Sequence, residues 1–369
     1  MTTLLAGDDA ATLHDELVAL AREFARDRIA PRALALALDA GDRAAFDACW
    51  SGLVTIGLDR ALLPEEHGGC DLPAALLPPL LEELAAADGG LAACVLLSNA
   101  ALAALPREAL PTGREGERWV LALPPAPPAA GSATLLVERM ARAPALLHGT
   151  VPAALGALGA AGVVLLPAPT AHAPLLVPSG TPGLRATEPA SQLGLRAAAA
   201  ADLQFDGAEL GTLVGFGPGF DGPRLRSLLH AGIAAIADGV ARRAYRIALD
   251  YAEQRIQGGG PIIGHGAVRS LLAGMAARLH ARQPAGRSLG AADALAARIR
   301  ATDDAVETTL DAVQVLGGIG YMREVGAEKL MRDAKQCQLY PEPNWVARDE
   351  LLELERRVTG LHLRSTSVA

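Results

Sequence analysis

Residues Gln314–Gln338 read QVLGGIGYMREVGAEKLMRDAKQCQ and carry more information about the fold than any other stretch of the chain. Gly317 and Gly318 follow a helical pattern, and glycine is favoured where a helix ends. Two adjacent glycines also let a phosphate or a nucleoside approach the backbone closely. Taken alone, the glycine pair predicts an ordinary helix end, and Arg332-Asp333 predicts an ion pair on the surface. Which of these interpretations of the glycine pair holds depends on the rest of the segment.

The sequence around this segment divides into three zones. Residues 1–112 have apolar side chains at helical spacing, residues 113–221 hold short apolar runs bounded by proline and glycine, and residues 222–369 return to helical spacing. The pattern has no strand–helix–strand alternation, which argues against a parallel βαβ sheet. We therefore predict a mainly α protein: an N-terminal helical domain (1–112), a small middle β barrel or sandwich (113–221) and a C-terminal four-helix bundle (222–369).

Individual elements follow from the same patterns. We expect the first helix to end at Pro31, because proline disfavours helical geometry in the residue before it. An Asp206-Gly207 pair after an apolar run predicts a turn. Further helices are expected over 43–56, 73–105, 225–251, 268–279, 290–316 and 346–358, and strands over 119–123, 133–137, 163–166 and 201–205.

Composition excludes several classes of function. The 369 residues carry a net charge of −8 and only 3% aromatic side chains, which is unsuited to binding nucleic acid. Four cysteines without a CxxC pair predict neither a zinc site nor a disulfide framework, so we expect no metal and a reducing, cytoplasmic location. The first ten residues lack a secretion signal, and no apolar run predicts a membrane span.

The combination QVLGGxGY, RDA and Tyr340 closely resembles the C-terminal signature of the acyl-CoA dehydrogenase superfamily. Tyr251–Ile262 (YAEQRIQGGGPI) is similar to that family's YAxxRxQFGxPI segment, and Pro64–Gly69 (PEEHGG) to its PEEYGG turn. Gln192–Asp206 (QLGLRAAAAADLQFD) looks like its strand pair GLRxSxTxxLxFxD. The resemblance covers about the whole chain in order, so it implies the family's fold of two helical domains around a β domain.

The resemblance also implies a cofactor, a substrate class and a partner. These are FAD, an acyl thioester of CoA or of a carrier protein, and a second subunit, since each flavin of the family lies at a subunit interface. By the same resemblance Arg255 would neutralise the pyrophosphate of the neighbour's FAD, because a guanidinium binds two phosphate oxygens at once. The remaining implied FAD contacts are Gln257, Gln314, Gly317, Gly318 and, from the flavin-side strand, Ser132.

The chain departs from the family at the catalytic base. The usual base is the Glu of a Tyr-Glu-Gly-Thr motif, whereas this chain reads YPEPN over 340–344, with Pro341 at the base position and Glu342 one residue later. The alternative base position on the first bundle helix falls on Leu229. The flavin-side segment is altered too: 123–133 reads LPPAPPAAGSA and keeps only its Gly-Ser pair.

Three functions stay open at this point. The first is an FAD-dependent dehydrogenase that desaturates an acyl thioester between its α and β carbons, with Glu342 as a displaced base. The second is a non-catalytic subunit that completes the FAD site of a homologous partner. The third is a flavin-dependent monooxygenase on the same fold, in which His230 or His148 acts as an acid–base group. Self-association or a homologous partner subunit is expected in each case.

Overall fold

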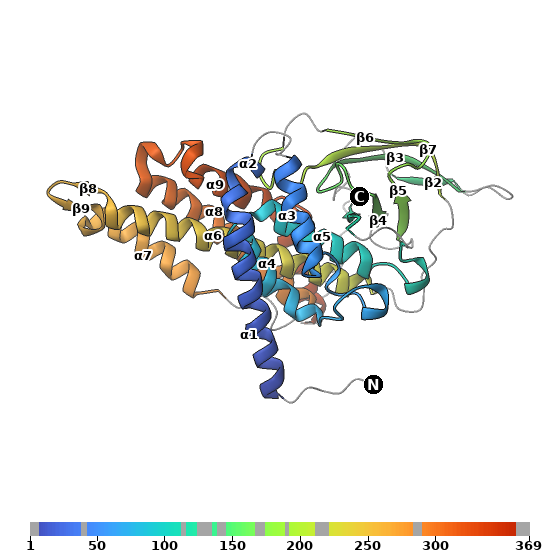
Figure 1. Cartoon of the computed structure of the whole chain (residues 1–369), viewed down its shortest axis with the longest axis horizontal. Helices are drawn as coiled ribbons and strands as arrows, with labels where there is room; N and C mark the ends of the chain where they lie inside the picture. The colour runs from blue at the N-terminus through green and yellow to red at the C-terminus, as the bar shows by residue number, and fades with distance from the viewer. Residues whose placement is uncertain are drawn as a thin grey trace, which may run out of the picture.

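A computed structural model describes residues 7–37, 43–111, 116–123, 135–138, 145–166, 174–188, 192–210, 221–282 and 290–358. The N-terminal region and the C-terminal bundle are helical, and strands lie between them in sequence (Figure 1). Within these residues no helix is both long and apolar enough to cross a bilayer. The helices are α1 (Gly7–Phe24), α2 (Ala33–Leu36), α3 (Arg43–Thr55), α4 (Leu77–Ala85), α5 (Gly89–Ala103), α6 (Gly222–Gln254), α7 (Gly266–His280), α8 (Ala291–Leu316), α9 (Ala327–Cys337) and α10 (Asn344–Val358).

The middle strands form two sheets. One has the order β2 (Leu136–Glu138), β3 (Ala145–Ala154), β7 (Ala201–Leu210) and β6 (Leu184–Thr187), all antiparallel. The other has the order β1 (Trp119–Ala122), β4 (Gly162–Leu165) and β5 (Leu175–Pro178). Its β1–β4 pair is parallel, but β2 and β3 intervene in sequence, so the described part of this connection forms no βαβ unit. A short hairpin of β8 (Ile256–Gln257) and β9 (Gly260–Pro261) joins α6 to α7.

Two local predictions were wrong. The chain does not leave helical geometry at Pro31: a π-helical turn over Ala25–Ile29 and a 3-10 turn over Ala30–Arg32 carry it into α2. Asp206 and Gly207 do not end β7 either. Gly207 has a φ of 64°, and the pairing register with β3 shifts beside it, so the pair forms a β-bulge within the strand. The predicted boundaries at 112 and 221 lie in or beside undescribed stretches and stay predictions.

Helix α5 forms the centre of the core. Its sequence, GGLAACVLLSNAALA, is apolar on all sides, which is typical of a fully buried helix. It packs against α4, α6 and β1. Its buried Asn99 donates to the carbonyl oxygens of Leu58 and Val95 (both 2.9 Å) and accepts from the Leu62 amide (3.0 Å).

A buried charge cluster joins the three zones. Lys329 Nζ of α9 lies 3.0 Å from Asp88 Oδ2 and 2.6 Å from Asp333 Oδ2. Asp88 caps α5 by accepting from the Leu91 amide, and Asp333 accepts from the Leu195 amide between β6 and β7. Asp333 is thus a buried partner of Lys329, and the surface Arg332-Asp333 ion pair expected from the sequence does not form. We call Asp88, Lys329 and Asp333 the junction triad.

Lys329 stabilises the charges of both carboxylates of the junction triad, which repel each other. Burial opposes the charge of Lys329, but the carboxylates of Asp333 and Asp88 outweigh burial and raise its pKa above the usual value. The ammonium therefore stays charged at neutral pH. Glycine is required beside the triad, because a Cβ at Gly194 would meet the Arg332 carbonyl oxygen at 2.1 Å.

We predict that Lys329→Met destabilises the chain by about 3–5 kcal/mol, because it leaves two buried carboxylates without a cation. Urea unfolding measures this loss. Lys335→Met, on the exposed side of the same helix, is the matched control and should change stability by less than about 0.5 kcal/mol. Equal urea midpoints for Lys329→Met and wild type would show that the triad does not hold the zones together.

Candidate functional site

The segment that carries Glu342 links α9 to α10 and is held by Arg298 of α8. Arg298 is 0% exposed, and its Nη1 donates to the carbonyl oxygens of Tyr340 (3.0 Å) and Glu342 (2.9 Å). Its Nη2 lies 3.1 Å from Glu342 Oε1. One guanidinium therefore holds both the backbone of this segment and the carboxylate of Glu342, which is itself only 4% exposed.

Helix α6 supplies the other side of the site. His230 Nδ1 lies 3.8 Å from Glu342 Oε1, and Arg226 Nη2 lies 4.0 Å from Glu342 Oε2. Arg226 also pairs with Glu350 of α10 at 2.6 Å. Glu342 and His230 directly follow Pro341 and Leu229, the two positions where the resemblance places a base. The structure thus brings both segments to one point, and we call Arg226, His230, Arg298, Glu342 and Glu350 the Glu342 cluster.

Burial controls ionisation in this cluster. It raises the pKa of Glu342, against the opposing charges of Arg298 and Arg226. Burial, followed by the charges of the same two arginines, holds the pKa of His230 well below its ordinary value. His230 is therefore a neutral imidazole at neutral pH, and Arg298 provides the compensating charge for an ionised Glu342.

Unused hydrogen-bonding capacity is concentrated here. Eleven buried side-chain N and O atoms of the described chain lack a hydrogen-bond partner. Seven of them belong to this region: His230 Nδ1 and Nε2, Arg298 Nε and Nη2, Tyr340 Oη, Glu342 Oε1 and Asn344 Oδ1. Arg298 Nη2 and Glu342 Oε1 form an ion pair with each other at 3.1 Å, which leaves five atoms without any hydrogen-bond partner. Because buried polar groups are almost always paired, such a concentration is typical of a place where a polar ligand group or water binds.

The same cluster offers a possible set of metal ligands. One ligand atom each from His230, Glu342 and Glu350 lies within 4.8 Å of the others. Both carboxylates already have guanidinium partners, however, and a divalent ion would stand beside Arg226 and Arg298. The repulsion between these fixed cations and the ion argues against a metal here.

The residues expected to reach a neighbour's FAD lie elsewhere. Arg255 caps the C-terminal end of α6, with its side chain exposed, and Gln257 is exposed in β8. Gln314 is exposed near the end of α8, and a Cβ added at Gly317 or Gly318 would meet nothing within 4 Å. A guanidinium, two amides and two side-chain-free backbone positions fit the pyrophosphate and adenosine end of FAD.

Helix direction places this second group at one end of the bundle. His230 and Arg298 both reach Glu342, and further along the two helices Asp238 and Asp304 line one cavity, so α6 and α8 run in the same direction. Their C-terminal ends, and with them Arg255 and the Gly317-Gly318 pair, therefore point the same way. We call Arg255, Gln257, Gln314, Gly317 and Gly318 the FAD-tail group.

The two groups are far apart within one chain. His230 and Arg255 are 25 residues apart on α6, which corresponds to about 37 Å of helix. That span exceeds the length of an extended FAD molecule, so one chain cannot place His230 and Arg255 on the same cofactor. The role of Glu342 as the base and the roles of the FAD-tail group as FAD contacts stay predictions.

Two further predicted residues belong to the middle zone. Ser132 lies in 124–134, outside the described residues. His148 lies in β3, where its Nδ1 accepts from the Gly207 amide (3.2 Å) and its Nε2 lies 3.6 Å from Glu138 Oε2. It is not part of the Glu342 cluster.

Sequence reasoning missed Arg298 and Glu350. The signal for Arg298 was present: it lies between Ala294, Leu295 and Ala301, on the buried side of a helix where a charged side chain is rare without a partner. The identity of that partner could not be read from spacing, since Glu342 is 44 residues away.

Two family models match the chain: "Acyl-CoA dehydrogenase, N-terminal domain" over residues 12–113 and "Acyl-CoA dehydrogenase, C-terminal domain" over residues 229–341. The cyclohex-1-ene-1-carbonyl-CoA dehydrogenase of Geobacter metallireducens is 30% identical over an alignment of 370 positions, which covers 89% of this chain and 94% of the relative. The chain belongs to the acyl-CoA dehydrogenase family. The superfamily and the fold class predicted from the sequence are confirmed.

Other family members match in part or in fold. An acyl-CoA dehydrogenase of Bacillus subtilis is 37% identical over 186 residues, but this match spans only 47% of this chain and 49% of that relative. The butyryl-CoA dehydrogenase structure from Megasphaera elsdenii has a TM-score of 0.79 at 23% identity, covering 96% of this chain and all of that one. An acyl-CoA dehydrogenase from Bacillus anthracis, complexed with FAD, has a TM-score of 0.81 at 18% identity, covering 96% and 69%.

The Arg298–Glu342 pair gives a testable prediction. Arg298→Met should cost about 3–5 kcal/mol of unfolding free energy, because it leaves a buried carboxylate without its cation. Arg298→Met with Glu342→Gln should recover much of that loss, since no charge is then stranded. Urea denaturation of both single variants and the double variant measures the coupling. Arg226→Met, at a half-exposed pair, is the control and should cost less than about 1 kcal/mol; strictly additive losses would contradict the pairing.

Proposed function

We propose that this chain is an FAD-dependent oxidoreductase that removes hydrogen from the α and β carbons of an acyl thioester, carried by CoA or by a carrier protein. Family membership supports the reaction class, and the chemistry of the FAD-tail group fits the cofactor. The observation that carries the catalytic part is the buried Glu342 carboxylate. It lies where the family's two base-bearing segments meet, among polar atoms without partners.

Glu342 would accept the proton that leaves the α carbon. Its carboxylate is ionised when it does so, and Arg298 compensates that charge. After the transfer the carboxyl is neutral, but Arg298 Nη1 still holds the carbonyl oxygens of Tyr340 and Glu342, so the segment keeps its position. The neutral His230 adds no charge that would oppose either state. FAD, when bound, supplies the acceptor for the hydride from the β carbon.

A second function is favoured by one observation, the distance between the two groups. The FAD-tail group is exposed at the end of the bundle, and its Arg255 lies about 37 Å from His230 along α6, so Arg255 would act on a cofactor held mainly by another subunit. Such a chain completes a partner's site whether or not its own Glu342 catalyses. A half-site subunit of a hetero-oligomer is therefore the alternative, and a homologous chain is the expected partner.

We predict that Glu342→Gln slows anaerobic flavin reduction by an acyl thioester about 10²–10⁴-fold, because the general base is lost while size is kept. Flavin absorbance measures the rate, and bound FAD should be unchanged. Glu353→Gln, an exposed change on α10, is the control and should react as wild type does. If Glu342→Gln reduces flavin as fast as wild type, Glu342 is not the base.

We predict that Arg255→Ala weakens FAD binding about 10–100-fold, since a charge-assisted contact worth about 1.5–3 kcal/mol is removed. Fluorescence titration of FAD measures this, with the exposed Arg243→Ala on the same helix as control. FAD binding by the chain alone favours the homo-oligomeric enzyme. Binding only after mixing with a homologous subunit, still weakened by Arg255→Ala, favours the half-site alternative; FAD retention by Arg255→Ala in both settings would contradict the assigned contact.

A further inference from the structure

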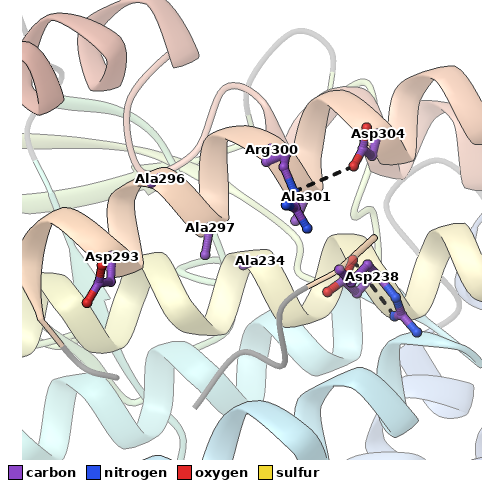
Figure 2. A pocket seen from close by; sticks show the side chains of 9 residues that line it. Ala234, Asp238, Asp293, Ala296, Ala297, Arg300, Ala301 and Asp304 are labelled. Carbon is purple, nitrogen blue, oxygen red and sulfur yellow. Dashed lines mark ion pairs between the residues drawn. The ribbon is translucent and has the colours of Figure 1, made fainter. Parts of the chain in front are cut away.

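A cavity of about 250 Å³ lies between α6 and α8 (Figure 2). Ala234, Ala297 and Ala301 give it small apolar walls, and Asp238 of α6 faces the α8 side chains across it. The remaining lining residues are Arg282, Asp293, Ala296, Arg300 and Asp304.

Asp238 is an incompletely paired carboxylate on this cavity. It is 5% exposed, and no group in the described chain donates a hydrogen bond to it. The nearest cation, Arg282 Nη1, lies 3.8 Å from its Oδ1, beyond hydrogen-bond distance, and the same Nη1 is 3.0 Å from Glu82 Oε1. Arg300 is paired with Asp304. Asp238 is thus held by one long ion pair and has acceptor capacity left toward the cavity.

We propose that this cavity binds a small organic ammonium ion, with the cationic head on Asp238 and a short apolar body against the alanine walls. A carboxylate with free acceptor capacity selects a donor of positive charge, and the three lining carboxylates outnumber the two lining guanidiniums. The cavity volume leaves room for an apolar body of about one ring. No residue of the Glu342 cluster lines the cavity, and Asp238 follows His230 by eight residues, about 12 Å along α6. The proposal does not depend on the chain's redox activity.

Ionisation of Asp238 makes the proposal pH-dependent. Burial raises the pKa of Asp238 to about 7; Arg282 and Arg300 oppose this shift, and Glu82 and Asp304 add to it. A cation binds the ionised carboxylate, so affinity should rise as the pH passes upward through 7. Without ligand, the stability of the fold should change with pH in the direction opposite to the ligand affinity. The folded state retains a proton that the unfolded Asp gives up near its ordinary pKa, so stability should fall as the pH rises through 7.

Calorimetric titration of the full chain with benzylammonium chloride tests the site, with benzyl alcohol as a neutral ligand of matched shape. We expect benzylammonium to bind at least tenfold more tightly at pH 8.0 than at pH 5.5, and benzyl alcohol not to bind measurably. Asp238→Asn should weaken benzylammonium binding at pH 8.0 at least tenfold. Asp250→Asn, an exposed change on the same helix, should leave it unchanged.

Thermal unfolding of Asp238→Asn checks that the variant is folded. Because Asn does not ionise, this variant should lose less stability between pH 6 and pH 8 than wild type. Equal affinity for benzylammonium and benzyl alcohol, undiminished binding by a folded Asp238→Asn, or no binding at either pH would each overturn the proposal and leave a cavity that holds only water.

Discussion

The junction triad is the interaction on which the arrangement of the three zones depends. One ammonium, on Lys329, pairs with a carboxylate that starts the central helix α5 and with another that holds the segment before β7. Each of these groups would be costly to bury alone, so the three segments are stable only when they are together. Because α9 carries both Lys329 and Asp333 and leads directly into the Glu342 segment, the triad also determines where that segment begins.

A second buried cation, Arg298, then orients the segment itself. The guanidinium satisfies two backbone carbonyls as well as a carboxylate, which an aliphatic side chain or a lysine could not do with the same geometry. As a consequence, the carboxylate that we propose as the base is also a partner in an ion pair. Its burial raises its proton affinity while the guanidinium lowers it, and these opposing effects leave a group whose ionisation depends on its immediate surroundings.

The long helices were predictable because their apolar residues recur at helical spacing over many turns, as in α6 and α8. The family signature could also be recognised from the sequence, because its residues are close together along the chain. The contacts of the junction triad were not predictable, since Asp88, Lys329 and Leu195, whose amide donates to Asp333, come from three zones and no local pattern links them. The turn predicted at Asp206-Gly207 was wrong because an Asp-Gly pair is compatible with both a turn and a β-bulge. Pairing with the opposite strand, β3, determines which of the two forms. The FAD roles of the exposed residues rest on resemblance, because free side chains do not reveal their ligand.

One unbroken helix, α6, carries His230 near its start and reaches Arg255 at its end. Because the helix is long and rigid, a substitution that abolishes the reaction at one end leaves the geometry of the other end unchanged. After a gene duplication, one copy can therefore lose its own reaction centre and still be retained by selection for what its far end does for the sister copy.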